Sequence, residues 1–236
     1  MDLSKLTPIL LAGGLGSRLQ HVISDRPKCL APINDRPFIY YIFDQLIQIG
    51  FKDILIATHH LSSVLTERVG ASYKSLSITY IYEPEPLGTG GALKNAASQC
   101  KTEYLFCMNA DSYLEHDFRK SIASLSISSN YIYIVNILNS SRFGVVEYDE
   151  NTCIVKNFHE KETNESRIHA PRSINAGIYI ICKDDILNVW DSKFSIETYF
   201  LPMLTETQNL LCIAAQGKFI DIGIPNDYRK AQSFFT

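Results

Sequence analysis

The sequence has no marked excess of charge of either sign and no long hydrophobic run. Its 236 residues carry 22 Lys and Arg against 25 Asp and Glu, a formal net charge of −3. Nucleic-acid-binding domains usually have a basic excess, so this balance argues against a nucleic-acid partner. The longest apolar stretches, Tyr131–Leu138 and Ile174–Cys182, are far shorter than the roughly 20 residues of a membrane-spanning helix. We therefore expect no membrane association.

Cysteine pairs with metal-binding or redox spacing are also missing. The six cysteines are spread over the chain and none forms a Cys-x-x-Cys pair: Cys29, Cys100, Cys107, Cys153, Cys182 and Cys212. Buried, reduced thiols are the simplest interpretation. The apolar run at the N-terminus is too short for a signal peptide. Together these features predict a cytoplasmic protein.

What is present is an alternation of short apolar runs and helix-like segments through the first two thirds of the chain. Strand-like runs fall at 8–11, 53–57, 76–82 and 104–108, and helix-like segments at 37–49, 61–69 and 92–100. Such alternation predicts an α/β fold of Rossmann-like type, with a mixed, mostly parallel central sheet and helices on both faces. Ligands of these sheets bind beyond the carboxyl ends of the strands.

The second part of the chain has a different pattern. Strand-like segments at 131–138, 143–148, 152–158 and 173–182 are followed by a helix near 195–205, short strands near 211–214 and 219–222, and a last helix from Pro225. Because no linker or repeat separates the parts, we expect one domain over 1–236. Its N-terminal half would end near residue 115, and a substrate-binding half would occupy about 116–236.

A glycine-rich loop at 11–19 follows the first predicted strand. Its glycines allow backbone N–H groups to approach phosphate oxygens, and the Arg18 guanidinium adds further donors. The loop lacks the Gly-Lys-Ser/Thr ending of a Walker loop. It also has Leu19 where a dinucleotide fingerprint has its third glycine, and no acidic residue follows the second strand. The loop therefore predicts a phosphate site of a different kind.

Six motifs in sequence order resemble the sugar-1-phosphate nucleotidylyltransferase family. They are the loop 13–19 followed by Pro27-Lys28, then 85–92, 109–111, 158–161, 175–179 and 219–225. The resemblance covers residues 8 to about 230. Members of this family join a nucleoside triphosphate to a sugar 1-phosphate, giving a nucleotide sugar and pyrophosphate. The resemblance thus implies an enzyme with nucleotide and sugar-phosphate sites.

The resemblance also implies which residues form these sites. Lys28, Arg18 and Asp111 would be catalytic. The nucleotide would lie against Leu11, Ala12, Gly13, Gly14, Gly16, Ser17, Glu83, Pro86, Leu87, Gly88 and Thr89. The sugar phosphate would lie against Gly144, Glu160, Lys161, Asn175 and Gly177.

The same resemblance makes Asp111 and Asp221 the ligands of a Mg²⁺ cofactor. Mg²⁺ prefers carboxylate and phosphate oxygens, so the residue types suit it. An alternative for Asp111 is a purely structural role as a helix N-cap. Because Asp111 and Asp221 are far apart in the chain, only the fold can bring them together.

Glu83 lies five residues before Gly88 and could read the edge of the base. An ionised carboxylate only accepts hydrogen bonds. Guanine offers it two donors, N1–H and the 2-amino group, whereas thymine and uracil suit the Gln that the thymidylyl branch of the family tends to carry. We therefore expect GTP as the nucleotide partner. The alternative is that Glu83 is a solvent-exposed end of a strand.

Four segments, 31–38, 174–179, 193–197 and 219–228, most resemble the bacterial D-glycero-α-D-manno-heptose 1-phosphate guanylyltransferases. The alternatives are mannose 1-phosphate guanylyltransferases and short uridylyl-, cytidylyl- or thymidylyltransferases. A non-catalytic nucleotide-sugar-binding protein would be expected to lack one of Arg18, Lys28, Asp111 and Asp221. We interpret Arg142, Arg167 and Arg172 as solvated loop charges. We expect no appended β-helix domain. The sequence leaves open whether the protein is a monomer or a homodimer.

Overall fold

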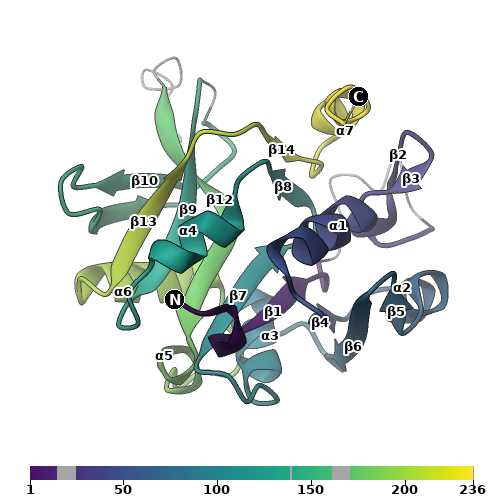
Figure 1. Cartoon of the computed structure of the whole chain (residues 1–236), viewed down its shortest axis with the longest axis horizontal. Coiled ribbons are helices and arrows are strands. Elements are labelled where there is room, and N and C mark those ends of the chain that lie inside the picture. Colours follow the sequence, from purple (N-terminus) through teal and green to yellow (C-terminus); the bar gives the residue numbers. More distant parts are fainter. Residues whose placement is uncertain (15–24, 139, 161–170, 236) are drawn as a thin grey trace.

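The computed structural model describes residues 1–14, 25–138, 140–160 and 171–235 (Figure 1). The helices are α1 Ile39–Ile49, α2 Ser62–Val69, α3 Gly88–Ala97, α4 Phe118–Ser124, α5 Lys183–Leu187, α6 Leu201–Glu206 and α7 Pro225–Ala231, with a π-helical turn η4 Ile196–Phe200 and 3-10 turns η1 Leu3–Lys5 and η2 Lys28–Leu30. The strands are β1 Leu6–Leu11, β2 Pro32–Ile33, β3 Arg36–Pro37, β4 Asp53–Thr58, β5 Ser72–Tyr73, β6 Leu76–Tyr82, β7 Tyr104–Asn109, β8 Ser112–Leu114, β9 Asn130–Ile137, β10 Val145–Tyr148, β11 Val155–His159, β12 Arg172–Cys182, β13 Leu210–Ala215 and β14 Phe219–Asp221.

A 10-stranded sheet runs through the molecule in the order β11-β10-β12-β7-β1-β4-β6-β5, with β9 pairing β12 and β13. Strands β7, β1, β4 and β6 are parallel to one another, whereas β12 joins β7 in antiparallel pairing. The mixed sheet with a parallel centre confirms the predicted fold class. The second part of the chain supplies a mostly antiparallel side, in which β13 alone pairs in parallel, with β9, among the described strands.

The register of the parallel strands brings their carboxyl ends to one edge. Leu11 at the end of β1 is aligned with Asn109 on β7 and with Ala57 on β4. Backbone bonds continue past the strands, because Ala110 N donates to the Leu11 carbonyl over 3.1 Å. The loops after β1, β6 and β7 therefore meet at this edge.

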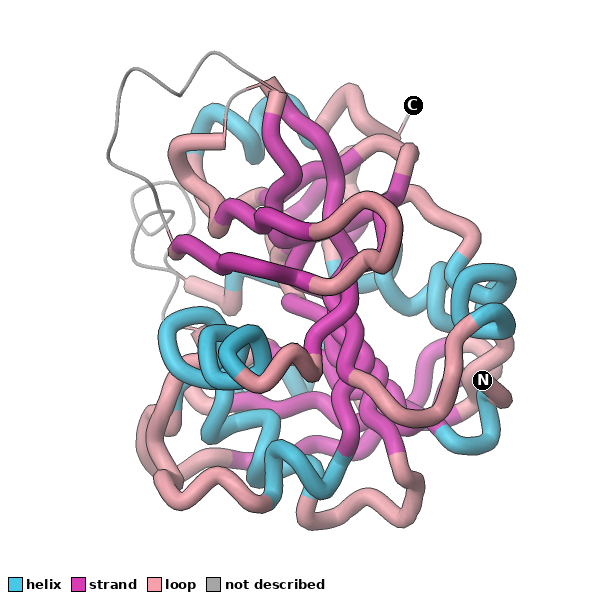
Figure 2. The backbone as a smooth tube through the Cα atoms, turned by 90° about the vertical axis from the view of Figure 1, so that its left-hand side faces the viewer, coloured by secondary structure: helices cyan, strands magenta, loops and turns pink. Residues whose placement is uncertain are grey.

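Helices cover both faces of the sheet, as Figure 2 shows. Alternation along β1 divides the core, since Leu10 belongs to the apolar cluster of one face and Ile9 to that of the other. Helices α1, α2, α4 and α7 contribute to the first cluster, and α3, α5 and α6 to the second. The glycine after α1, Gly50, has φ 114° and ends that helix at the end of the predicted segment 37–49.

Two local differences from the sequence prediction matter for the site. Helix α3 begins at Gly88 rather than at Ala92, so the glycine-rich segment 88–91 is its first turn. Strand β8 was not predicted, and it pairs antiparallel with β14. Both differences arise because these short segments are held by tertiary partners rather than by an apolar period of their own.

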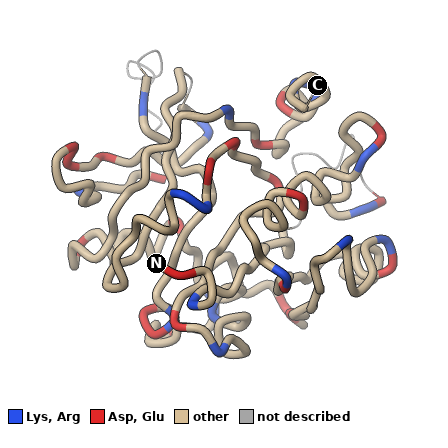
Figure 3. The backbone as a smooth tube through the Cα atoms, in the orientation of Figure 1, with Lys and Arg blue, Asp and Glu red and all other residues tan. Residues whose placement is uncertain are grey.

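No helix in the described part of the chain is long and apolar enough to cross a bilayer. Figure 3 shows basic and acidic residues interspersed along the backbone, in keeping with the small net charge.

Candidate active site

A pocket of about 300 Å³ opens at the carboxyl edge of β1, β6 and β7. Ten of the residues implied by the family resemblance line it: Leu11, Ala12, Gly13, Gly14, Lys28, Glu83, Pro86, Gly88, Thr89 and Asp111. Cys29, Ala92, Asn109 and Ala110 complete the lining. The fold thus brings these predicted residues together, whereas the predicted residue Leu87 is not part of the lining. Gly16, Ser17, Arg18 and Lys161 lie outside the described residues.

Lys28 and Asp111 form an ion pair in this pocket. Lys28 Nζ donates to Asp111 Oδ2 over 2.7 Å, and the two side chains are 16% and 29% exposed. Lys28 begins the 3-10 turn η2 directly after Pro27, and Asp111 follows the end of β7. Two loops that are distant in sequence therefore hold a cation and an anion in contact in the lining of this pocket.

Asp111 and Asp221 approach one another because β8 and β14 are paired. Asp221 is aligned with Ser112 in this ladder, and Ile222 N donates to the Asp111 carbonyl over 2.9 Å. The buried Ser112 hydroxyl lies 3.4 Å from Asp111 Oδ1 and 3.3 Å from Asp221 Oδ2. The structure thus brings together the two carboxylates that the motifs suggested.

The electrostatics of this pair favour a cation. Burial, and next to it the nearby negative charge of Asp111, raise the pKa of Asp221 to about 6, against the lowering effects of Gly223 N–H, Lys28 and Arg142. A cation bound between the two carboxylates would offset the repulsion between their negative charges.

The donor set suits Mg²⁺ better than zinc. The described residues contain no cluster of three or more His, Cys, Asp and Glu that could hold a metal. A structural zinc site needs four such ligands. Mg²⁺ is usually held by one or two carboxylates together with water and substrate phosphate oxygens. The Asp111 and Asp221 carboxylates therefore fit a divalent cation that arrives with a phosphorylated substrate.

Glu83 is buried rather than solvent-exposed. Its exposed fraction is 3%, which excludes the alternative of a solvated strand end. Oε2 accepts from Leu87 N over 3.3 Å, whereas Oε1 is buried without a hydrogen-bond partner among the described residues. Oε1 lies beside Gly13, where an added Cβ would come within 3.3 Å of it. Burial raises the pKa of Glu83.

The described sugar-phosphate candidates form a second group on β10 to β12. Asn175 N donates to the Gly144 carbonyl over 2.9 Å, and Gly177 N donates to Asn175 Oδ1 over 2.8 Å. An added Cβ at Gly144 would lie 3.0 Å from Glu160 Oε2. Gly177 has φ 71° and packs on the side chain of Asn109, which lines the pocket that also contains Lys28 and Asp111. The second group is therefore continuous with the first.

The interpretation of Arg142 as a solvated charge is wrong. Its side chain is 27% exposed and its guanidinium pairs with Asp227, while NH1 lies 3.7 Å from Asp221 Oδ1. The ring of Phe143 lies under the guanidinium at 4.9 Å. The guanidinium of Arg142, which the sequence analysis assigned to solvent, therefore lies near the predicted metal ligand Asp221. This happens because the turn before β10 folds against β14.

The glycines at 88–91 have a packing role that the motif did not reveal. Phe194 N donates to the Leu87 carbonyl, and Gly90 N and Gly91 N both donate to the Phe194 carbonyl. An added Cβ at Gly88, where φ is 75°, would come within 2.5 Å of the Phe194 carbonyl oxygen. The glycines therefore admit residues 192–194 against the first turn of α3, and Gly88 lines the pocket as well.

Replacing Gly90 with Ala is expected to destabilise the protein by about 1–3 kcal/mol, because the new Cβ would stand 2.2 Å from the buried Phe194 ring. Urea unfolding followed by circular dichroism measures the change. Gly14→Ala is the matched control, since no atom of the described residues lies within 4 Å of a Cβ there. Equal unfolding midpoints for the two variants would contradict the packing role.

Comparison with known proteins decides the family. The model of the family described as nucleotidyl transferase matches residues 7–236. The chain belongs to the nucleotidyl transferase family. Two relatives named D-glycero-alpha-D-manno-heptose 1-phosphate guanylyltransferase, from Campylobacter jejuni and Aneurinibacillus thermoaerophilus, are each 35% identical. The matches cover 93% and 95% of this chain and 96% of each relative.

Solved structures agree with this assignment of a nucleotidyltransferase. HddC from Yersinia pseudotuberculosis superposes with a TM-score of 0.86 at 33% identity, covering 98% of this chain and 99% of its own. A second structure of HddC, complexed with GMP-PN, has a TM-score of 0.85. A Bacillus anthracis protein described as a putative glucose-1-phosphate thymidylyltransferase has a TM-score of 0.83 at 19% identity, which supports the fold alone.

In this nucleotidyltransferase one acidic residue near the pocket escaped the motif analysis. Glu197, in η4, accepts a hydrogen bond from the pocket residue Thr89 over 2.7 Å. The signal was present, because 193–197 is one of the segments on which the heptose resemblance depends. The segment carried no chemical role by itself, and only its docking on α3 shows where Glu197 points.

Proposed function

We propose that this nucleotidyltransferase is a guanylyltransferase that transfers GMP from GTP to D-glycero-α-D-manno-heptose 1-phosphate, releasing pyrophosphate. The buried, partly unpaired carboxylate of Glu83 carries the proposal. The names of the two relatives at 35% identity and the HddC complex with GMP-PN support it.

Glu83 suits guanine because one of its carboxylate oxygens has no hydrogen-bond donor in the described part of the protein. Oε1 has no donor among the described residues, and a buried acceptor without a partner costs free energy. Guanine presents N1–H and the 2-amino group on one edge, so a single carboxylate can accept from both. Uracil and thymine present one donor between two acceptors, and their carbonyl oxygens would face the carboxylate. GTP is therefore favoured over UTP and dTTP.

The reaction is an in-line attack. A phosphate oxygen of the sugar 1-phosphate forms a bond to the α-phosphorus of GTP, and the bond from that phosphorus to the bridging oxygen of pyrophosphate breaks. No proton needs to be removed from the nucleophile, so charge stabilisation is the main catalytic task. Lys28, which lines the pocket, would bind the triphosphate once it exchanges its contact with Asp111 for phosphate oxygens.

Asp111 and Asp221 would hold the Mg²⁺ ion, which when bound neutralises negative charge on the phosphates. The sugar would bind beside Asn109, against Gly144, Glu160, Asn175 and Gly177. Glu160 and Asn175 offer acceptors and a donor for hydroxyl groups. Arg18, Gly16, Ser17 and Lys161 remain expected contributors from the family resemblance.

The test is a matrix of GTP, UTP, CTP and dTTP against heptose, mannose and glucose 1-phosphates, with pyrophosphate release as the readout. We expect kcat/KM to be highest for GTP with the heptose 1-phosphate, by at least about 10-fold over each other pair. A preference for mannose 1-phosphate would retain the guanylyl transfer and replace the sugar. A preference for another nucleotide would overturn the role of Glu83.

A further inference from the structure

The carboxyl ends of β4 and β6 are held together beyond their last paired residues. Thr58 and Tyr82 form the last aligned pair of these parallel strands, and Glu83 N then donates to the Thr58 carbonyl over 2.9 Å. His59 Nδ1 lies 2.7 Å from the Glu83 carbonyl oxygen. Two consecutive residues at the end of β4 therefore hold both backbone polar groups of Glu83.

The imidazole of His59 is the donor in the bond to Glu83. A carbonyl oxygen only accepts hydrogen bonds, so Nδ1 carries the proton. In a continued parallel ladder, this bond would come from a backbone N–H of the neighbouring strand. Residues 60–61 form a turn instead, and the chain enters α2 at Ser62. The side chain of His59 thus takes the place of that backbone donor.

The other neighbours of Glu83 in the sheet leave its backbone to these two bonds. Pro84 follows directly and has no N–H, so β6 cannot continue its pairing through that residue. Among the described strands, β5 pairs with β6 only at Leu76 and Ser77, at the start of β6. The bonds from the β4 side therefore determine where the Glu83 backbone lies.

The position of the Glu83 backbone in turn places the carboxylate in the pocket. Oε2 accepts from Leu87 N over 3.3 Å, and Oε1 lies beside Gly13 in the pocket lining. His59 borders the same glycine, since its N and Cβ would each lie 3.6 Å from an added Cβ at Gly13. Hydrogen bonds weaken steeply with distance and angle, so a small shift of the Glu83 backbone would impair acceptance by Oε1.

A purely structural role for the His59 bond predicts a different result from a positioning role. A bond that only stabilised the edge of the sheet would alter the fraction of folded enzyme, and its loss would reduce turnover of every nucleotide by the same factor. A bond that places the Glu83 carboxylate would alter the relative use of nucleotides, because they differ at the base edge. Nucleotide selectivity therefore separates the two roles.

We propose that His59 is a positioning residue for base recognition: its Nδ1–H holds the Glu83 carbonyl and so places Glu83 Oε1 to accept hydrogen bonds from the base. This inference rests on the proposed function, because it needs Glu83 to read the edge of guanine. It assigns a role to a residue outside the six motifs. His59 acts through Glu83 and does not itself need to touch the nucleotide.

The test compares kcat/KM for GTP and for UTP in wild type, His59→Ala and His59→Asn. In His59→Ala the ratio of GTP to UTP is expected to fall about 10-fold, the effect of weakening a hydrogen bond to a charged acceptor. His59→Asn should keep the ratio within about 3-fold of wild type, because Asn Nδ2 is as many bonds from Cα as His Nδ1 and can donate to the same carbonyl. The KM for the sugar 1-phosphate should change less than about 2-fold in both variants. His59→Gln, whose amide nitrogen lies one bond further from Cα, replaces His59→Ala if that variant does not fold.

A double-mutant cycle shows whether His59 acts through Glu83. In the Glu83→Gln background, His59→Ala should change the ratio less than about 3-fold, because the carboxylate that His59 positions is already absent. His60→Ala is the matched control, because it removes the adjacent, half-buried imidazole and leaves the bond from His59 to Glu83 in place. A wild-type ratio in His59→Ala, or a fall of the same size in both backgrounds, would overturn the proposal.

The proposed function fails separately, when wild type prefers another nucleotide over GTP. The same cycle is then measured with the preferred nucleotide. Additive effects of the His59 and Glu83 substitutions on its kcat/KM would rule out the positioning role, and non-additive effects would support it for whichever base the carboxylate reads.

Discussion

Replacing Asp221 with Asn is expected to lower kcat/KM at least about 1,000-fold while it stabilises the metal-free protein by about 1–2 kcal/mol at pH 7.5. Activity falls because one of the two candidate ligands for the divalent cation loses its charge. Stability rises because burial and the charge of Asp111 raise the pKa of Asp221 to about 6, so its ionised form is disfavoured in the folded state at pH 7.5. Asn keeps an oxygen for the Gly223 N–H, which lies 3.0 Å from Asp221 Oδ1.

The pH dependence of the free energy of unfolding tests whether the substitution stabilises the protein for this electrostatic reason. A carboxyl whose pKa is raised on folding contributes most to stability when it is protonated, and this contribution is lost as the pH rises through about 6. Wild type and Asp221→Asn should therefore have similar stability near pH 4, and the variant should be more stable above pH 6. Urea unfolding in the presence of a chelator measures the difference. Asp53→Asn, at an exposed position on β4, is the control, and an unstabilised but inactive Asp221→Asn would contradict the electrostatic account.

Replacing Glu83 with Gln is expected to reduce the preference for GTP over UTP by at least about 100-fold in kcat/KM. The carboxylate can accept from both guanine donors, whereas the amide retains one acceptor and presents a donor. Loss of a hydrogen bond to a charged acceptor in a buried site costs about 1.5–3 kcal/mol, and the repulsion of a uracil carbonyl by the carboxylate is removed at the same time. The two changes act in opposite directions on the two nucleotides.

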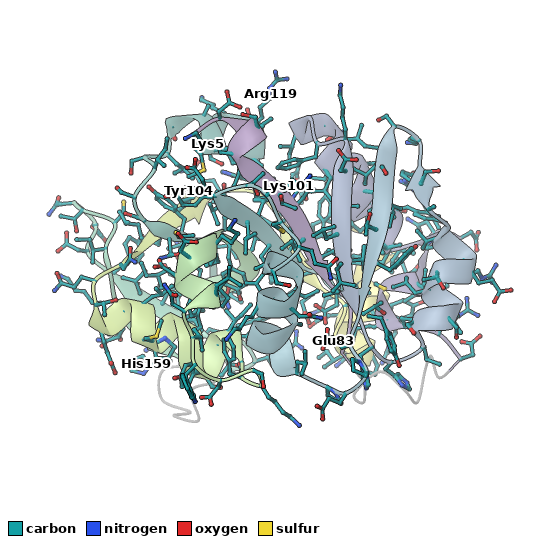
Figure 4. The ribbon with its side chains drawn as sticks, turned by 90° about the horizontal axis from the view of Figure 1, so that it is seen from below. Lys5, Glu83, Lys101, Tyr104, Arg119 and His159 are labelled. Atoms are coloured by element: carbon teal, nitrogen blue, oxygen red, sulfur yellow. The ribbon has the colours of Figure 1, made fainter. Side chains whose placement is uncertain are left out.

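The measurement is initial velocity with each of the four nucleotides and one sugar phosphate. Glu85→Gln is a close control, because Glu85 lies two residues away and is exposed. A nucleotide profile that stays the same in a folded Glu83→Gln variant would remove Glu83 from base recognition. Figure 4 shows Glu83 and His159, the last residue of β11, at the same edge of the molecule, away from Lys5 beside the start of β1. The carboxyl ends of β6 and β11 therefore lie toward the same side of the molecule.

Local sequence determined the elements that have a strong apolar period or a clear end signal. The strands β1, β4, β6 and β7 are continuous or alternating apolar runs, and Gly50 and Gly70 end α1 and α2 with positive φ. These patterns act over a few residues, so they can be read without the fold. Ordered motifs also identified the family and Lys28, Glu83 and Asp111 as residues of one pocket.

Tertiary structure decided the features that depend on distant partners. The pairing of β8 with β14 brings Asp111 and Asp221 together, and the folding of the turn before β10 converts Arg142 from an expected solvated charge into a partner of Asp221 and Asp227. The docking of Phe194 explains the glycines of α3 and brings Glu197 into hydrogen-bond contact with the pocket residue Thr89. Burial, the distance between charges and close packing depend on residues that are far apart in the chain. They are set only when the chain has folded, so local sequence patterns do not predict them.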